Sequence, residues 1–287
     1  MASPRETGIR FFYRRDTEHD RAATRAEIGV LAMRPHIPAL DTAAMPWAER
    51  NKGIYSKMLS QDPETGARTA LQRLVPEAGY TPPTVAHFHH ADEEILVVKG
   101  LLSFDSRDWL GPRGYVFHPA ETVHGFKSAV PEESWFISRV SKELDFNYVP
   151  EPPQTTYYSA YNRPPKREIS VVKQAVDAGG WVDERDGYGG RGWTRQLVLG
   201  RNSQTGEGSH FIRLLPGWEM PKGDFVHDVY NESFVLEGEV QLADGTLRKT
   251  GSYSFIPPGI AQPSARSPKG ALLYVNVGGP LDFRSVS

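Results

Sequence analysis

The sequence predicts an all-β protein that contains two copies of one domain. Short apolar or alternating runs recur along its 287 residues, and 27 glycines and 23 prolines separate them. This punctuation is typical of a β-sandwich or β-barrel and not of alternating strands and helices. The length also exceeds that of most single domains. A short helix is expected only near the N-terminus, at 17–28.

The second observation is an internal repeat. EEILVVKG at 93–100 matches NESFVLEG at 231–238, and PAETVH at 119–124 matches PPGIAQ at 257–262, both with a shift of 138 residues. Thr65-Gly66 and Thr205-Gly206 match with a shift of 140. Such an ordered series of matches indicates tandem copies of one domain.

The repeat and the composition together suggest the domain boundaries. We expect an N-terminal arm at 1–45, a first domain at 46–150, a proline- and tyrosine-rich linker at 151–168 and a second domain at 169–287. Two roles are open for the arm: an extra strand, or an exchange between the subunits of a homodimer, which is the expected oligomer.

Composition excludes several kinds of partner. Thirty-three lysines and arginines nearly balance 35 aspartates and glutamates, so no overall charge favours nucleic acid or an anionic membrane. No apolar run is long enough to span a bilayer, and the charged N-terminus does not look like a secretory signal, so a cytoplasmic location is expected. Cysteine is absent, so any metal must be held by nitrogen and oxygen atoms.

The stretch HFHHADEE at 87–94 predicts a metal site in the first copy. Side chains two apart in a strand share a face, so His87 and His89 project together and can chelate one ion. A third ligand is available from Glu93 or Glu94, or from His124. Five of the nine histidines, at 87, 89, 90, 118 and 124, fall in this window. Those at 90 and 118 are expected to lie beside the site or on the surface.

HFHHADEEILVVKG and GYVFHPAETVH together resemble the two signature motifs of the cupin superfamily. The pattern carries over to His87, His89, Glu93, Gly100, Gly114, Pro119 and His124. One departure is Glu121, which stands where the family has glycine. The resemblance covers both halves and implies a bicupin: two double-stranded β-helix (jelly-roll) domains in tandem, with metal inside the mouth of a barrel. Counting back from Gly100 selects Glu93 as the family's glutamate, and Glu94 then faces the other way.

The second copy has lost this ligand set. Gln262 stands in place of His124, Asn231 stands in place of Glu93, and His227 corresponds to either His87 or His89. Two amides and one imidazole make a poor site for a divalent transition metal. We therefore expect a scaffold domain, or a pocket for a small polar ligand without metal.

A closer resemblance concerns the reaction. GYVFHPAETVHGFKSAVPEESWFISRVSKELDF at 114–146 and GGPLDF at 278–283 are similar to segments of acetylacetone (β-diketone)-cleaving dioxygenases, and anti-sigma-factor-type cupins share much of this look. The resemblance implies mononuclear Fe(II) held by His87, His89 and His124, with Glu93 as a catalytic residue and a fourth ligand or a nearby carboxylate. The implied reaction uses dioxygen to cleave a C–C bond of a small dicarbonyl, hydroxyketone or aromatic-derived substrate.

The donor set leaves other metals and functions open. Zn, Mn, Ni and Co also bind nitrogen and oxygen ligands, and a non-redox ion would suit an isomerase or a lyase. A metal- or ligand-sensing cupin without turnover is the alternative from another class. Two or three aromatic residues of the first copy are expected to contact a ligand at the barrel mouth and the others to lie in the core, while three cations are expected either to bind a substrate oxygen or to lie on the solvated surface. These residues are Phe88, Phe104, Trp109, Phe117, Phe126, Trp135 and Phe136, with Arg113, Lys127 and Arg139.

Overall fold

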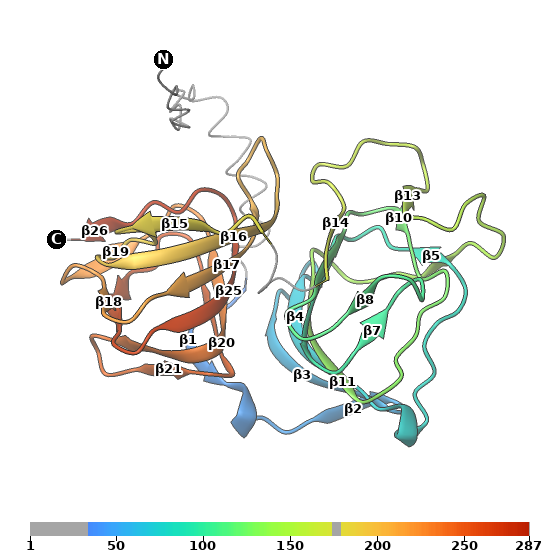
Figure 1. Cartoon of the computed structure of the whole chain (residues 1–287), viewed down its shortest axis with the longest axis horizontal. Helices are drawn as coiled ribbons and strands as arrows, with labels where there is room; N and C mark the ends of the chain where they lie inside the picture. The colour runs from blue at the N-terminus through green and yellow to red at the C-terminus, as the bar shows by residue number, and fades with distance from the viewer. Residues whose placement is uncertain (1–33, 174–178, 287) are drawn as a thin grey trace, which may run out of the picture.

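In a computed structural model, the described residues, 34–173 and 179–286, form two antiparallel β-domains that lie side by side (Figure 1). Two short 3₁₀ turns, η1 (Thr42–Ala44) and η2 (Pro76–Ala78), are the only helical elements of this part of the chain. The expected helix at 17–28 and residues 1–33 of the arm lie outside the described residues. None of the described elements is a helix of the length and apolarity that a membrane span requires.

The N-terminal domain is built on a sheet with the order β14-β9-β6-β11-β4-β3-β2. Shorter pairs, β5 with β12, β7 with β8 and β10 with β13, close the barrel over one face of this sheet. The strands are β2 (Ala48–Asn51), β3 (Ile54–Gln61), β4 (Arg68–Leu74), β5 (His87–Phe88), β6 (Glu93–Lys99), β7 (Leu102–Ser103), β8 (Trp109–Leu110), β9 (Tyr115–His118), β10 (Thr122–Val123), β11 (Ser134–Val140), β12 (Asn147–Tyr148), β13 (Tyr158–Ser159) and β14 (Ser170–Val172).

The C-terminal domain repeats this arrangement with the order β1-β22-β20-β25-β17-β16-β15. Its strands are β1 (Ile37–Asp41), β15 (Val182–Arg185), β16 (Trp193–Arg201), β17 (Gly208–Leu214), β18 (Trp218–Glu219), β19 (Asp224–Val226), β20 (Asn231–Leu242), β21 (Leu247–Lys249), β22 (Ser252–Ile256), β23 (Gln262–Pro263), β24 (Ala265–Ser267), β25 (Ala271–Val277) and β26 (Arg284–Val286). The prediction of an all-β chain with two copies of one domain is confirmed.

Alternation along β6 explains how one strand serves two cores. Ile95 and Val97 face the interior of the N-terminal barrel and pack with Leu110 and other buried side chains there. Leu96, which is fully buried, faces the opposite way into a cluster that contains residues of both domains, such as Leu272. A strand buried on both faces needs the near-continuous apolar run that β6 has. In addition to the interior of each barrel, the two domains therefore share a hydrophobic cluster at their junction.

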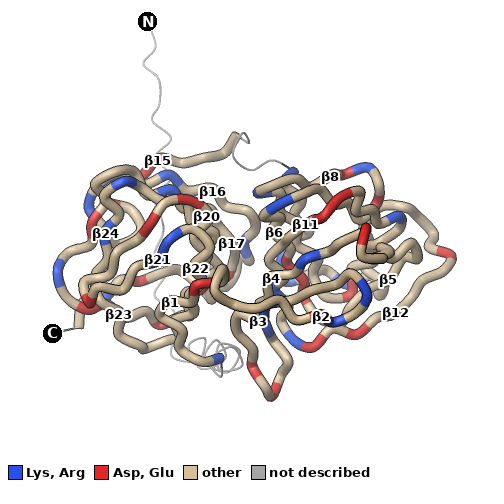
Figure 2. Tube along the Cα trace, turned by 90° about the horizontal axis from the view of Figure 1, so that it is seen from below, with Lys and Arg blue, Asp and Glu red and all other residues tan. Residues whose placement is uncertain are grey.

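The domains also exchange edge strands. β1 precedes the N-terminal domain in the chain but pairs with β22 of the C-terminal sheet, with Leu40 opposite Tyr253. In the same way β14, which leads into the C-terminal domain, pairs with β9, with Val171 opposite Val116. Figures 1 and 2 show the N-terminal segment running from β1 to β2 across the junction. Residues 37–41 thus supply an extra strand within the same chain. Each exchange covers a sheet edge that would otherwise expose unpaired backbone groups.

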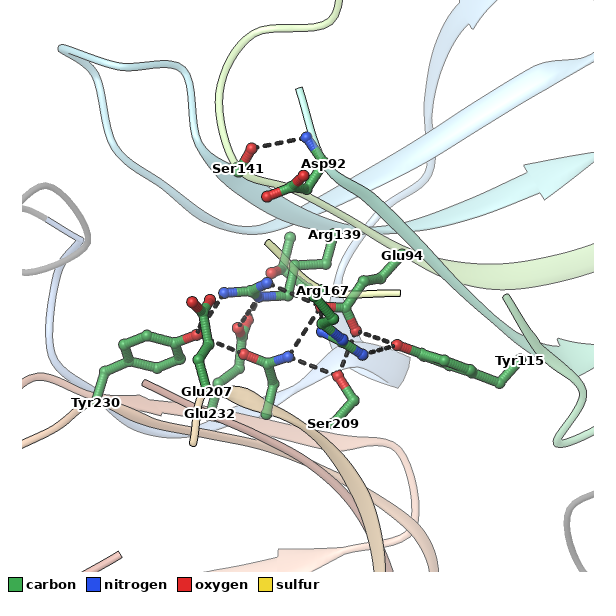
Figure 3. A network of polar contacts seen from close by, with 12 residues as sticks. Asp92, Glu94, Tyr115, Arg139, Ser141, Arg167, Glu207, Ser209, Tyr230 and Glu232 are labelled. Atoms are coloured by element: carbon green, nitrogen blue, oxygen red, sulfur yellow. Dashed lines mark hydrogen bonds and ion pairs between the residues drawn. The ribbon is translucent and has the colours of Figure 1, made fainter. Parts of the chain in front are cut away.

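A buried polar cluster, here called the interdomain network, lies where the two sheets face each other (Figure 3). Its centres are two carboxylates at equivalent positions of the two copies, Glu94 and Glu232, both nearly fully buried. Three arginines surround them: Arg34 lies 2.7 Å from Glu232, Arg167 lies 3.0 Å from Glu94, and Arg139 contacts both carboxylates at 3.0 to 3.1 Å. Buried charges are tolerated when they are paired in this way.

The two copies of the repeat contribute equivalent contacts to the interdomain network. Tyr115 donates a hydrogen bond to Glu94 at 2.8 Å, and the equivalent Tyr253 donates one to Glu232 at 2.6 Å. Burial disfavours ionisation of both glutamates, but the neighbouring arginines and hydrogen bonds lower the pKa of each to about 2. Both carboxylates are therefore ionised at neutral pH. Acidic and basic residues are interspersed along the backbone trace of both domains (Figure 2).

Candidate metal centre

Three histidines predicted from the sequence meet inside the mouth of the N-terminal barrel. One ligand atom each of His87, His89 and His124 lies within 4.8 Å of the others, and all three side chains are buried. His87 comes from β5, and its backbone pairs with that of His124 across the mouth. Strand pairing thus brings together residues that are 37 positions apart in the sequence.

Each of these imidazoles is anchored by a backbone carbonyl. The Nδ1 atom of His87 lies 3.0 Å from the oxygen of Val85, that of His124 lies 2.8 Å from the oxygen of Thr122, and that of His89 contacts the oxygen of Asp145. A hydrogen bond of this kind places the proton on Nδ1, and so the Nε2 lone pair is free to bind a metal. The three side chains therefore have the tautomer and the orientation that a metal site needs.

Gly125 makes room for this arrangement. Its φ of +75° lies in the left-handed region, and a Cβ added to it would lie 2.6 Å from the Cε1 atom of His87. Any larger residue at 125 would therefore displace a candidate ligand.

Two further side chains, Glu93 and His118, adjoin the three histidines. The Oε2 atom of Glu93 lies 3.5 Å from Nε2 of His124 and 3.4 Å from Nδ1 of His118. The ring of His118 stacks on that of His124 with centroids 4.1 Å apart. His118 is 1% exposed, and its Nε2 atom has no hydrogen-bond partner among the described residues. His118 therefore lies beside the site, which is one of the two places expected for it. A bound ion is one way to satisfy such a group.

The protonation states suit a cation at this place. Burial, together with the neighbouring histidines, lowers the pKa of His124 well below its ordinary value, and burial also lowers the pKa of His87. Burial opposes ionisation of Glu93, but the hydrogen bond from His118 and the nearby imidazoles keep its pKa below the usual range. Neutral imidazoles beside an ionised carboxylate are the donor set that borderline divalent metals bind. The residues present fit a mononuclear metal ion.

Aromatic side chains form the walls of the site. Phe104 packs edge-on against His118 and His124, as expected for one of the aromatics of this half. Two others, Phe146 and Tyr157, were not predicted. Phe146 contacts His89 at a centroid distance of 4.7 Å and remains 52% exposed, so it lies at the rim. Tyr157 reaches His118 from the segment expected as a linker, where β13 pairs with β10.

The expectation for Arg139 is wrong. Arg139, considered as a ligand for a substrate oxygen or as a surface residue, is buried in the interdomain network and bonds to Glu94, Glu232 and Tyr230. Glu94, expected to face the other way from Glu93, belongs to β6 and is one centre of that network. Both residues thus contribute to the contact between the domains and not to the candidate metal centre, although Glu94 follows Glu93 directly in the sequence. His90 lies at the margin, where Asp145 binds it at 2.5 Å.

The C-terminal barrel lacks the equivalent ligands. Phe225 pairs with Gln262 as His87 pairs with His124, which places Phe225 at the position of His87. His227 then corresponds to His89, and its Nδ1 atom likewise binds a backbone oxygen, that of Asp282, at 3.0 Å. The strand register thus shows that His227 is equivalent to His89 and not to His87, a choice that the sequence leaves open. Among the described residues, two groups of side chains could hold a metal, and both lie in the N-terminal barrel: His87 with His89 and His124, and Glu93 with His118 and His124.

Comparison with known proteins agrees with this fold. Residues 38–144 match the family described as the ChrR cupin-like domain. A candidate dioxygenase from Nostoc punctiforme is 17% identical, with a TM-score of 0.68, and the match covers 92% of this chain and 94% of that one. The salicylate 1,2-dioxygenase of Pseudaminobacter salicylatoxidans is 13% identical, with a TM-score of 0.53, covering 93% and 95%.

A third solved structure, a cupin 2 conserved barrel domain protein from Leptotrichia buccalis, is 10% identical with a TM-score of 0.51, and the match covers 85% of this chain and 97% of that one. No curated protein matches the sequence. At these identities the structural likenesses show the fold alone. Residues 38–144 thus match the ChrR cupin-like family, and the chain as a whole has the fold of two cupin jelly rolls in tandem.

Proposed function

We propose that the protein is a mononuclear non-haem Fe(II) dioxygenase that cleaves a C–C bond of a small dicarbonyl, hydroxyketone or aromatic-derived substrate. The observation that carries the proposal is the set of three imidazoles, His87, His89 and His124, each held by a backbone carbonyl so that Nε2 is free. Three protein ligands leave coordination positions for other molecules, whereas closed sites typically have four. The resemblance of 114–146 to acetylacetone-cleaving dioxygenases and the likeness to two structures described as dioxygenases support the same reaction class.

A ferrous ion at this place would supply the one-electron chemistry that lets dioxygen react with an organic molecule. The chain's own contribution is to orient the ligands and to shape an apolar site. Phe104 on one side and Phe146 at the rim place apolar rings against the imidazoles.

Glu93 is the carboxylate of this site. Because its pKa is held below the usual range, it is ionised at neutral pH and can accept a proton. A β-dicarbonyl compound has an acidic C–H between its carbonyls, and removal of that proton gives an enolate that binds a cation through two oxygens. We propose that Glu93 accepts this proton or serves as a fourth metal ligand.

Metal analysis together with oxygen uptake tests the proposal. Protein purified without added metal is analysed for iron, zinc, manganese, nickel and cobalt, and the ferrous form is assayed with acetylacetone, a hydroxyketone and salicylate. We expect about one iron per chain and substrate-dependent oxygen consumption that His124→Ala abolishes. Near-stoichiometric zinc without oxygen uptake on any of these compounds would contradict the proposal.

One observation favours a second function, that of a non-redox or sensing cupin. Glu93 lies 3.5 Å from His124 and belongs with His124 and His118 to a second group of candidate ligands, so that a carboxylate could join the histidines as a fourth ligand. Four protein ligands from nitrogen and oxygen would close the coordination shell, which is typical of zinc sites without turnover. A closed site of this kind would bind zinc in preference to iron, and the Glu93→Gln variant would then bind zinc more weakly without any gain of oxygen uptake.

A further inference from the structure

The C-terminal barrel encloses a cavity of about 50 Å³ at the place that corresponds to the metal centre. Because one water molecule needs about 10–15 Å³ by this measure, the cavity has room for about three to five non-hydrogen atoms. Its walls are mostly apolar, with Phe225, Trp218 and Phe283 among them. A few polar side chains converge on it: His227, Asn231, Gln262, Tyr188 and Arg248.

Arg248 is a cation at a barrel position where the first copy has an apolar residue. Val240 pairs with Arg248 between β20 and β21, as Leu102 pairs with Leu110 in the first copy. Arg248 therefore stands in place of Leu110, which is 1% exposed in the core of the N-terminal barrel. Along β21 the neighbours of Arg248 are exposed while Arg248 itself is half-buried, because alternate side chains of a strand face opposite ways.

No carboxylate forms an ion pair with this guanidinium among the described residues, although Asp244 lies near enough to favour its charged form. Nε of Arg248 donates to the carbonyl oxygen of Pro38 at 2.7 Å, and its two terminal amino groups have no ion pair or hydrogen bond among the described residues. Burial lowers the pKa of Arg248 to about 10, so that it stays charged at neutral pH, whereas burial keeps His227 neutral by lowering its pKa. Arg248 is thus the cation that lines this cavity.

The remaining polar groups of the cavity are only partly satisfied. The Nδ2 atom of Asn231 donates to the hydroxyl oxygen of Tyr188 at 3.4 Å, which leaves the Tyr188 proton free to donate. The Oδ1 atom of Asn231 is buried without a partner among the described residues. Buried polar groups are normally hydrogen-bonded, and so an acceptor in this position calls for a donor on a bound molecule.

We propose that the C-terminal barrel binds a short hydroxycarboxylate, with its carboxylate on Arg248 and Tyr188 and its hydroxyl group on Oδ1 of Asn231. In this copy the fixed guanidinium replaces the metal ion as the positive charge inside the barrel. Planar guanidinium groups bind carboxylates through two parallel hydrogen bonds. Glycolate, with five non-hydrogen atoms, has both functional groups and is close to the size that the cavity accepts.

Isothermal titration of the full-length protein with glycolate, acetate and glycolamide tests this proposal. We expect glycolate to bind more tightly than acetate, which lacks the hydroxyl group. Glycolamide, which lacks the charge, should bind at least tenfold more weakly than glycolate. Arg248→Leu introduces the residue that the first copy has at this position, and it should weaken glycolate binding by about 30-fold or more. The control is Arg266→Leu, which removes an exposed arginine of the same domain that bonds to Gln241, and it should leave binding unchanged.

A second variant keeps the test decisive if Arg248→Leu does not fold. Asn231→Asp places a carboxylate in the cavity that would pair with Arg248 and repel glycolate, so binding should again be lost. Glycolate binding that survives both variants would overturn the proposal. So would binding that is lost with His124→Ala instead, because the carboxylate would then be bound at the metal centre of the N-terminal barrel.

Discussion

Glu93 and Glu94 are adjacent in β6 and project from opposite faces of the strand. The carboxylate of Glu93 lies 3.5 Å from Nε2 of His124 in the candidate metal centre, whereas that of Glu94 lies 3.1 Å from Nη1 of Arg139 at the junction of the domains. This alternation lets one strand carry both the candidate chemistry and the contact that joins the two barrels. Substitutions at the two positions should therefore have separable effects.

The first prediction concerns metal affinity. Glu93→Gln removes the charge closest to the histidines and should weaken metal binding by about 10- to 100-fold, the range found when residues that support metal ligands are changed. Its stability without metal should change little. Equilibrium dialysis against Fe(II) or Zn(II) measures the affinity. Equal affinities for the wild type and Glu93→Gln would show that this carboxylate takes no part in the site.

The second prediction concerns stability. Glu94→Gln leaves Arg139 and Arg167 without one of their buried counter-charges, and loss of one partner of such a pair costs about 3–5 kcal/mol. Urea unfolding in the presence of a chelator measures this cost without a contribution from metal. The control is Glu133→Gln, whose partners Arg73 and Lys99 are partly exposed, and it should cost no more than about 1 kcal/mol. Equal costs for the two variants would argue against a stabilising role of the interdomain network.

The third prediction concerns acid. Glu94 and Glu232 have folded-state pKa values of about 2, below the ordinary value of 4.5, so the unfolded chain binds more protons between these limits. Their contribution to the free energy of unfolding is complete above about pH 4.5 and is lost as the pH falls toward 2. The free energy of unfolding changes by at most about 1.4 kcal/mol per pH unit for each group. Urea unfolding between about pH 2 and 5 measures this dependence. The free energy of unfolding of Glu94→Gln should change less steeply with pH than that of the wild type, because one of the two groups is missing. Identical pH dependence of the two proteins would contradict the lowered pKa of Glu94.

The fourth prediction concerns the exchanged strand β1. A chain that starts at residue 46 lacks β1 and Arg34, so the edge of β22 is uncovered and Glu232 loses a counter-charge. We expect this chain to aggregate or to unfold at a lower temperature, because exposed sheet edges pair with other chains. Light scattering and thermal unfolding measure both effects. A chain that starts at residue 34 keeps these contacts and is the control; equal behaviour of the two chains would exclude a structural role for β1.

Much of the fold and of the candidate metal centre could be predicted from local patterns. The apolar runs and the repeat predict two β-domains, and the spacing of His87 and His89 predicts a shared face that the structure shows. The interdomain network could not be predicted in this way. In the sequence, Glu94 is one of several acidic residues in a polar stretch. Its partners are distant in the sequence and contact it only when the domains pack: Arg139, Arg167 and Asn276.

Distance in sequence also explains the two aromatics that were not predicted. Phe146 and Tyr157 lie beyond the second cupin motif, and only the return of the chain across the barrel mouth brings them to His89 and His118. The exchange of β1 depends in the same way on contacts between the domains. The matching positions of Glu94 and Glu232 in the repeat are a signal that could have indicated a shared structural role.

Metal stoichiometry in two matched variants tests the central claim most directly. His124→Ala removes a candidate ligand from the first copy, and Gln262→Ala changes the equivalent residue of the second copy. The purified full-length wild type and both variants are examined by elemental analysis. We expect one metal ion per chain in the wild type and in Gln262→Ala, and none in His124→Ala. Two ions per chain in the wild type, or retention of metal by His124→Ala, would contradict a single metal centre in the N-terminal barrel.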